Sequence, residues 1–220
     1  MLELIAASRT YDDGHPVHAL KPTTLAIGNG EYVTITGPSG SGKSTLLNLL
    51  GLLDSPTNGG YRVSGDETAG MSAGHLGSLR GRLFGFVFQA FHLLPGRTAL
   101  ENVELGMLYG PHRRAERRAR ALRAIEKIGL AHRAHADPRT LSGGERQRIA
   151  IARAIAGTPR VLFCDEPTGN LDSANTATVL RLLRELNAEG LTVVVITHDP
   201  EVAVAGTRTL TVVDGHVEEA

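Results

Sequence analysis

Apolar and polar residues alternate along the first part of the chain, which is the pattern of half-buried β-strands. Leu2, Leu4 and Ala6 mark one face of such a strand, and the Asp-Asp-Gly sequence at residues 12–14 ends it. The Gly-Asn-Gly sequence at residues 28–30 predicts a hairpin turn between two further strands. We therefore expect an antiparallel β region at the amino-terminal end.

Strands and helices alternate in the rest of the chain. Apolar, β-branched runs indicate strands, and apolar residues three and four apart indicate helices. The predicted strands cover residues 32–36, 161–164 and 192–197, and the predicted helices cover residues 45–50, 142–156 and 173–188. A final hairpin is predicted around Asp214 and Gly215. Strands separated by helices favour a mostly parallel sheet that helices cover on both faces.

The middle of the chain is helical in character from residue 100 to residue 128. Its arginine-rich segment at residues 113–123 is interpreted as a solvated helix face, with lipid headgroups or nucleic acid as the alternative ligands. The sequence thus predicts an α/β fold in a single domain, residues 1–220. This domain has an antiparallel β subdomain at its amino-terminal end and an inserted α-helical subdomain at roughly residues 90–157.

Composition narrows the class of protein. Lysine plus arginine equals aspartate plus glutamate at 23 each, so we expect no nucleic-acid partner. Cys164 is the single cysteine, which excludes an intrachain disulfide and suits a reducing compartment. No signal-peptide pattern opens the chain, and no apolar run reaches the roughly 18 residues of a membrane-spanning helix. We expect a soluble or peripheral protein.

A glycine-rich loop between a predicted strand and a predicted helix carries the strongest chemical signal. Its glycines allow backbone N–H groups to surround phosphate oxygens, and the helix amino terminus adds partial positive charge. Lys43 can reach the β- and γ-phosphates, and the Ser44 hydroxyl can ligate Mg²⁺. The predicted ATP-binding residues of this phosphate loop are Gly37, Pro38, Ser39, Gly40, Ser41, Gly42, Lys43, Ser44 and Thr45.

Two acidic residues follow the predicted strand at residues 161–164. Asp165 stands at its carboxyl end, where ligands bind in open α/β sheets, and can hold Mg²⁺. Glu166 comes next and can act as the base for an attacking water molecule. The alternative is a charged turn after a core strand.

The signature segment, residues 141–148 (Leu-Ser-Gly-Gly-Glu-Arg-Gln-Arg), opens another predicted helix. Ser142 and Glu145 have the spacing of a capping box, so the segment could be a capped helix and nothing more. Gly143 and Gly144 also leave bare N–H groups at the helix mouth, which would form a second anion site.

The order of these motifs over essentially all 220 residues resembles the ATP-binding-cassette family. The resemblance implies an ATPase whose chains pair head to tail around ATP and Mg²⁺. Ser142, Gly143, Gly144 and Glu145 of each chain would then face the ATP of the other. By the same resemblance Tyr11 stacks on adenine, Gln89 contacts Mg²⁺ and water, Asp172 lies in the loop that crosses the dimer interface, and His198 contacts the γ-phosphate.

The chain also contains four finer motifs, which are Gly-Leu-Leu-Asp at residues 51–54, Phe-Val-Phe-Gln at 86–89, Thr-Ala-Leu-Glu-Asn-Val at 98–103 and Gly-Asn-Leu-Asp at 169–172. These motifs resemble the lipoprotein-release and macrolide-export group (MacB/LolD-type). This resemblance implies a homodimer on ATP binding, peripheral on the cytoplasmic face of the cell membrane, that drives export or extraction through a separate permease. The segment after Gln89, with Phe91, Leu93 and Leu94, would contact the permease. Alternatives are a cassette that regulates a membrane partner without transport, or a soluble mechanical switch. Four glycines depart from the group and count against a helix before Gln89: Gly70, Gly74, Gly77 and Gly81.

Overall fold

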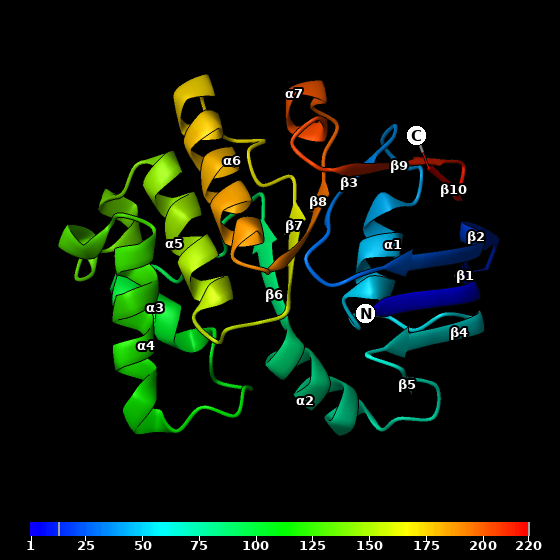
Figure 1. Cartoon of the computed structure of the whole chain (residues 1–220), viewed down its shortest axis with the longest axis horizontal. Coiled ribbons are helices and arrows are strands. Elements are labelled where there is room, and N and C mark those ends of the chain that lie inside the picture. Colours follow the sequence, from blue (N-terminus) through cyan, green and yellow to red (C-terminus); the bar gives the residue numbers. More distant parts are fainter. Residues whose placement is uncertain (13, 220) are drawn as a thin grey trace.

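Two β-sheets with a helix between them form one half of the molecule, and a group of helices forms the other. The structure is a computed structural model and describes residues 1–12 and 14–219, so Asp13 of the predicted strand break lies outside the described residues. In Figure 1 the green helices α3, α4 and α5 gather on the left, and the four-stranded sheet lies on the right. The predicted α/β fold with an antiparallel amino-terminal part is confirmed.

The larger sheet has six strands in the order β10-β9-β3-β8-β7-β6. Strands β9, β3, β8, β7 and β6 run parallel, and β10 returns antiparallel to β9 after the predicted turn at Asp214. The strands are β3 (Tyr32–Thr36), β6 (Phe84–Phe88), β7 (Val161–Asp165), β8 (Thr192–Ile196), β9 (Arg208–Val213) and β10 (His216–Glu219).

Central strands of this sheet are buried on both faces, which explains their continuous apolar sequences. On β7, Phe163 packs into the core beneath the four-stranded sheet, while Leu162 and Cys164 point into the core beneath the helices. Successive residues of β8 alternate in the same way, with Val194 and Val195 on opposite sides. The sheet is therefore the layer that the two hydrophobic cores share.

The smaller sheet is antiparallel and has the order β2-β1-β4-β5. Its strands are β1 (Leu2–Asp12), β2 (Pro16–Ile27), β4 (Asn58–Val63) and β5 (Asp66–Glu67). Leu2 and Leu4 are buried as predicted, but Ala6 is exposed with φ 45°, and Ala7 takes the buried position. A register shift between Leu4 and Ala7 breaks the alternation there, so the predicted inward position of Ala6 is wrong.

The turn at residues 28–30 connects the two sheets. Strand β2 before it belongs to the four-stranded sheet and β3 after it to the six-stranded sheet. The predicted hairpin is therefore wrong, because the flanking strands do not pair with each other. Strand β2 pairs with β1 instead.

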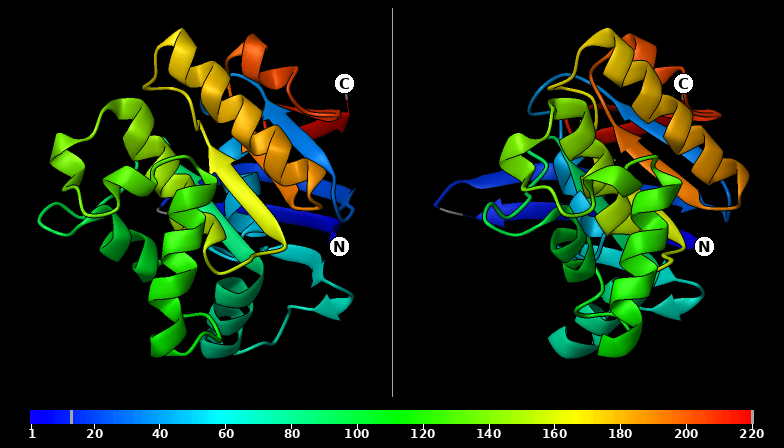
Figure 2. Two further views of the ribbon diagram at one scale, coloured as in Figure 1. Left: turned by 60° about the vertical axis from the view of Figure 1, so that its left-hand side comes forward. Right: turned by 90° about the vertical axis from the view of Figure 1, so that its left-hand side faces the viewer.

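Seven helices complete the described part of the chain. They are α1 (Lys43–Leu50), α2 (Ala73–Leu83), α3 (Ala99–Leu105), α4 (Arg114–Lys127), α5 (Gly143–Ile155), α6 (Ser173–Ala188) and α7 (Pro200–Ala203), with 3-10 turns η1 (Ala131–Arg133) and η2 (Pro138–Thr140). In the left view of Figure 2 the green helices α3, α4 and α5 again lie together on the left, and in the right view they lie in front of the sheets. The helical stretch predicted at residues 100–128 is divided in two. Helix α3 ends at Leu105 before Gly106, and α4 begins at Arg114 after Pro111, which the interior of one continuous helix would not tolerate.

Helix α2 forms although glycines count against it, and three of them, Gly74, Gly77 and Gly81, lie within it. The Ser72 side chain accepts a hydrogen bond from the His75 N–H and caps the helix. Leu79 and Leu83 are buried against the core between the sheets. A cap and two buried leucines offset the roughly 1 kcal/mol that each interior glycine costs relative to alanine. None of the described helices is both long enough and apolar enough to span a membrane.

Candidate functional site

A cavity of about 920 Å³ opens at the carboxyl ends of the parallel strands. The phosphate loop follows β3, and Asp165, Gln89 and His198 stand at or just after the ends of β7, β6 and β8. Ligands bind at this edge of open α/β sheets. The residues around the cavity are Val17, His18, Ala19, Gly37 to Thr45, Gln89, Asp165, Glu166, Ile196, His198, Asp214 and Gly215.

The phosphate loop has a backbone path that depends on glycine. Gly37 has φ 140°, and a Cβ there would lie 2.1 Å from the Val212 carbonyl oxygen. Helix α1 begins at Lys43 with no side-chain cap and no acidic residue in its first turn. Its first N–H groups therefore remain available to an anion, as the predicted phosphate site requires.

Lys43 is held over the loop by the loop's own carbonyl groups. Its Nζ donates hydrogen bonds to the oxygens of Gly37 at 2.8 Å and Pro38 at 2.7 Å. These oxygens keep the ammonium group at the mouth of the loop, where phosphate oxygens can replace them. Ser41 Oγ is buried and has no hydrogen-bond partner among the described residues.

Asp165 and Glu166 lie side by side in the same cavity. The pKa of Asp165 is raised, mainly by burial and further by the Glu166 charge, while Lys43 opposes the shift. A cation next to these carboxylates would relieve both effects. Glu166 has φ 47°, a strained conformation for a non-glycine residue, and its N–H donates to the Ile196 carbonyl at 3.0 Å.

Glu166 and His198 form a direct pair. Glu166 Oε1 lies 2.7 Å from His198 Nδ1 and also accepts the His198 backbone N–H at 3.1 Å. The hydrogen bond and the charge of Glu166 raise the pKa of His198. The histidine side chain is 72% exposed and is therefore free to turn, whereas that of Glu166 is only 16% exposed.

Oxygen donors suitable for Mg²⁺ meet in this cavity. They are the hydroxyl of Ser44, the side-chain amide oxygen of Gln89 and the carboxylate of Asp165. Residues 1–12 and 14–219 contain no group of three His, Cys, Asp or Glu side chains that could hold a metal on their own. This donor set fits Mg²⁺, which takes oxygen ligands and commonly completes its shell with substrate phosphates and water.

Tyr11 does not line the cavity. Its hydroxyl donates to Asp54 at 2.8 Å, and the Arg9 guanidinium lies 4.6 Å from the ring centre. Val17, which pairs with Tyr11 across β1 and β2, lines the cavity in its place. The stacking of Tyr11 on adenine stays a prediction.

Several lining residues escaped the sequence analysis, namely Val17, His18, Ala19, Ile196, Asp214 and Gly215. The first three belong to β2 in the other sheet, and nothing in their local sequence indicates a site. Gly215 was recognised only as part of a turn. Its N–H donates to the Ser41 carbonyl at 2.9 Å and ties that turn to the phosphate loop.

The signature segment opens α5 with the predicted capping box. Ser142 Oγ accepts the Glu145 N–H at 3.2 Å, and the Glu145 carboxylate accepts the Ser142 N–H at 2.8 Å. Glu145 also accepts a hydrogen bond from Arg133 at 2.9 Å, and these contacts lower the pKa of its carboxyl to about 2. A Cβ on Gly144 would lie 1.9 Å from the Asn175 side-chain oxygen, so this glycine lets α5 approach α6 closely.

The signature residues do not meet the phosphate loop of their own chain. None of residues 142–145 lines the cavity that the described residues form around the phosphate loop. Ser142 is exposed, and so is Asp172, which caps α6 by accepting the Asn175 N–H at 2.8 Å. The amino-terminal end of α5 at Ser142 is therefore exposed and outside the chain's own cavity, so a ligand held by another molecule can reach it.

The sequence of this chain is similar to those of known ATP-binding proteins of ABC transporters. The family described as "ABC transporter" matches residues 20–169. An uncharacterized ABC transporter ATP-binding protein of Bacillus subtilis (strain 168), YvrO, is 47% identical over 99% of this chain and 95% of its own length. The macrolide export ATP-binding/permease protein MacB 1/2 of Paracoccus denitrificans (strain Pd 1222) is also 47% identical over 99% of this chain, which spans 33% of that longer protein.

Solved structures agree with the sequence relatives. The dimeric structure of MJ0796, a bacterial ABC transporter cassette, is 44% identical with a TM-score of 0.88, covering 100% of this chain and 98% of that one. A dimeric post-hydrolysis state of the same ATP-binding cassette, bound to ADP and Pi, is 43% identical with the same TM-score and coverage.

Proposed function

The chain belongs to the ABC transporter family and is an ATP-binding cassette ATPase, and from that premise we propose that two copies enclose two ATP molecules to drive a membrane permease. One observation carries the proposal. The phosphate loop and the signature segment are both formed in the chain, yet the signature residues do not line the chain's own cavity. A second copy related by a two-fold axis supplies the missing side of each site, because such an interface repeats every contact.

The dimer explains why one chain has two anion sites although its own cavity holds a single ATP. Backbone N–H groups at the start of α1 bind the phosphates of one ATP, and the mouth of α5 binds the γ-phosphate held by the partner. Similarity to dimeric cassette structures supports this arrangement. Asp172 is exposed at the start of α6, and we assign it to the same interface.

Hydrolysis follows from the side chains around the cavity. Lys43 exchanges the carbonyls of Gly37 and Pro38 for the β- and γ-phosphate oxygens. Glu166 takes a proton from a water molecule while the oxygen of that water bonds to the γ-phosphorus. At the same time the bond between the γ-phosphorus and the β–γ bridging oxygen breaks. His198, whose side chain is 72% exposed, turns from Glu166 toward the γ-phosphate and frees the carboxylate.

Ser44, Gln89 and Asp165 are the residues that would hold Mg²⁺ next to the phosphates. The ion supplies positive charge that offsets the charge of the phosphate oxygens. Gln89 also connects the cavity to its surroundings, since its Nε2 donates to Asn170 at 3.4 Å and its carbonyl accepts from Asn170 at 3.0 Å. We expect a change in the nucleotide to reach the loop at residues 169–172 through Asn170, and the segment that follows Gln89 through the backbone.

That segment borders an apolar groove suited to a membrane partner. The groove measures about 830 Å³ and lies between α2, β6 and the end of α3. Tyr109, 85% exposed, and Leu53 project at its edge, and Leu94 is 48% exposed nearby in the chain. Leu93 packs on the core instead, and Phe91 lies under the Arg146 guanidinium. A cytoplasmic segment of the permease occupies this groove and places the cassette on the inner face of the membrane, exporting or extracting a substrate.

The nucleotide assignment is tested by replacing Lys43 with alanine. Lys127→Ala is the matched control, because Lys127 pairs with Glu189 and does not line the phosphate-loop cavity. We expect Lys43→Ala to lose tight ATP binding in calorimetric titration while its circular dichroism stays unchanged, and the control to bind like the parent chain. Near-normal ATP affinity in Lys43→Ala would remove Lys43 from its assigned role.

A further inference from the structure

A second cavity, of about 750 Å³, lies near the amino-terminal ends of the parallel strands, whereas the phosphate loop lies at their carboxyl ends. It forms where β3, β7 and β8 begin, between α4 and the carboxyl ends of α5 and α6. We name it the basic cleft. Its lining residues are Asn29, Arg120, Arg123, Ala124, Lys127, Ile155, Ala156, Thr158, Pro159, Arg160, Leu186, Glu189, Gly190 and Leu191.

Three arginines of the basic cleft carry uncompensated charge. Arg120 and Arg123 are one helical turn apart on α4, and Arg160 comes from the loop before β7. Their guanidinium groups form no ion pair and no hydrogen bond with any residue in the described ranges 1–12 and 14–219. Such groups are available to an anion. The fourth cation, Lys127, is paired with Glu189.

The positive charge of the lining side chains is larger than the negative partial charge at the neighbouring helix carboxyl ends. Helices α4, α5 and α6 all end at the cleft, and each carboxyl end carries roughly half a unit of negative charge. Together they offset roughly 1.5 units. The lining side chains are four cations against the single anion Glu189. A net positive charge therefore remains in the cleft, although the whole chain has equal numbers of basic and acidic residues at 23 each.

The floor of the cleft is apolar. Ala124, Ala156 and Leu186 are buried, and Ile155 and Leu191 pack against the same core. Small-molecule sites of about 300–1,000 Å³ typically combine an apolar lining with a few charged groups that orient the ligand. The cleft has this size and composition, so the ligand needs an apolar body as well as an anionic group.

We propose that the basic cleft binds a small amphiphilic anion, whose sulfonate, phosphate or carboxylate group lies between Arg120, Arg123 and Arg160 and whose apolar body lies on Ala124, Ile155 and Leu191. The ligand touches α4 on one side and the starts of β7 and β8 on the other, so it links the group of helices to the sheet. This site is separate from the ATP cavity, with which it shares no lining residue. It stands whether or not the proposed dimer forms.

The test uses the full chain with saturating ADP, so that the ATP cavity is filled. The probe is 1-anilinonaphthalene-8-sulfonate, an aromatic sulfonate that fluoresces in apolar surroundings, and N-phenyl-1-naphthylamine is its neutral counterpart. We expect saturable one-to-one binding of the sulfonate, weakened at least about tenfold by Arg123→Glu or Arg160→Glu, since hydrogen bonds to charged groups are strong. We expect the neutral probe to bind without saturation.

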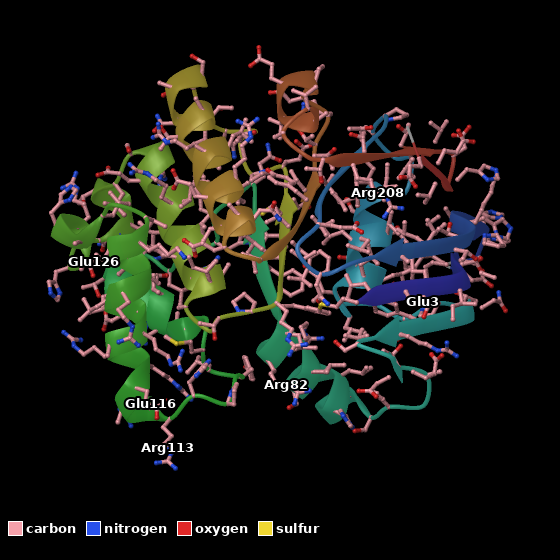
Figure 3. All side chains as sticks on the ribbon, viewed as in Figure 1. Glu3, Arg82, Arg113, Glu116, Glu126 and Arg208 are labelled. Carbon is pink, nitrogen blue, oxygen red and sulfur yellow. The ribbon has the colours of Figure 1, made fainter. Side chains whose placement is uncertain are left out.

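Arg114→Glu is the matched control, since Arg114 is on the same helix but does not line the cleft. Figure 3 shows the neighbouring Arg113 and Glu116 at the lower end of α4, with Glu126 farther up. Circular dichroism checks folding, and Arg123→Gln removes the charge without reversing it if Arg123→Glu fails to fold. Amide chemical shifts of Gly190 and Leu191 should move with the sulfonate. The proposal would be overturned if the sulfonate did not bind saturably or if Arg114→Glu weakened its binding equally. It would also be overturned if the chemical shifts moved only in the phosphate loop, or if the neutral probe bound with equal affinity.

Discussion

Replacing Ser142 by alanine separates two roles of the amino-terminal end of α5: the helix cap that the structure shows, and the contact with a partner's ATP that we propose. Within its own chain, Ser142 Oγ accepts the Glu145 N–H at 3.2 Å and caps the helix. Loss of such a cap costs about 1 kcal/mol, within a range of about 0.5–2 kcal/mol. For a chain of this size that lowers the melting temperature by about 2–4 °C per kcal/mol.

The second role concerns the ATP of the partner chain. Ser142 does not line its own cavity, so ATP binding by the monomer should be unchanged. ATP hydrolysis should fall about 10- to 100-fold, because a hydrogen bond to a charged group is worth about 1.5–3 kcal/mol. Calorimetric titration measures the binding, phosphate release measures hydrolysis, and a thermal melt measures stability.

Thr98→Ala is the matched control for this experiment. Thr98 caps α3 with the same capping box, accepting the Glu101 N–H at 3.2 Å, and does not line the ATP cavity. It should lose similar stability and keep the ATPase rate of the parent chain. If Ser142→Ala and Thr98→Ala reduce hydrolysis equally, or if Ser142→Ala weakens ATP binding by the monomer, then the signature segment does not act on a partner's nucleotide.

Two further predictions concern His198 and the apolar groove. Glu166 raises the pKa of His198, so the Glu166–His198 pair should stabilise the folded chain most when the histidine is protonated. This stabilisation should be complete below the ordinary histidine pKa of about 6.5, and it should be lost as the pH rises through the raised pKa. NMR titration of the ring should show this raised pKa falling in Glu166→Gln, and an unchanged value would show that Glu166 is not its cause. Tyr109→Glu in the groove should abolish co-purification with the permease yet leave the ATPase rate of the isolated cassette unchanged. The control Leu122→Glu, at an exposed apolar position on α4 outside the groove, should retain the permease. Retention of the permease by Tyr109→Glu would place docking elsewhere.

Local patterns predicted most of the core elements. The run at β3 and the helix α6 were predicted with the bounds that the structure has, because apolar periodicity and an Asp172 cap determine them locally. The phosphate loop was recognised for a similar reason. Its glycines and Lys43 act through neighbouring backbone groups, so their spacing in the sequence carries the information.

Features that depend on distant parts of the chain were missed. The turn at residues 28–30 resembles a hairpin locally, but β3 pairs with β8 and β9, whose residues come more than 150 positions later. The bulge at Ala6 coincides with register shifts in the pairing of β1 with both β2 and β4. Likewise β2 lines the ATP cavity only because the two sheets meet there. These features depend on which distant strands pair and in which register. The periodicity of apolar residues along one strand does not contain that information.

Glu166→Gln tests the two-chain site most directly. The amide cannot act as the base, so hydrolysis should slow by roughly 10²–10⁴-fold while ATP still binds, and the bound nucleotide should hold two chains together. Size-exclusion chromatography with light scattering should give a mass near 23.4 kDa without nucleotide and twice that value at saturating ATP with Mg²⁺. A Glu166→Gln chain that stays at the monomer mass at saturating ATP would contradict the proposed dimer.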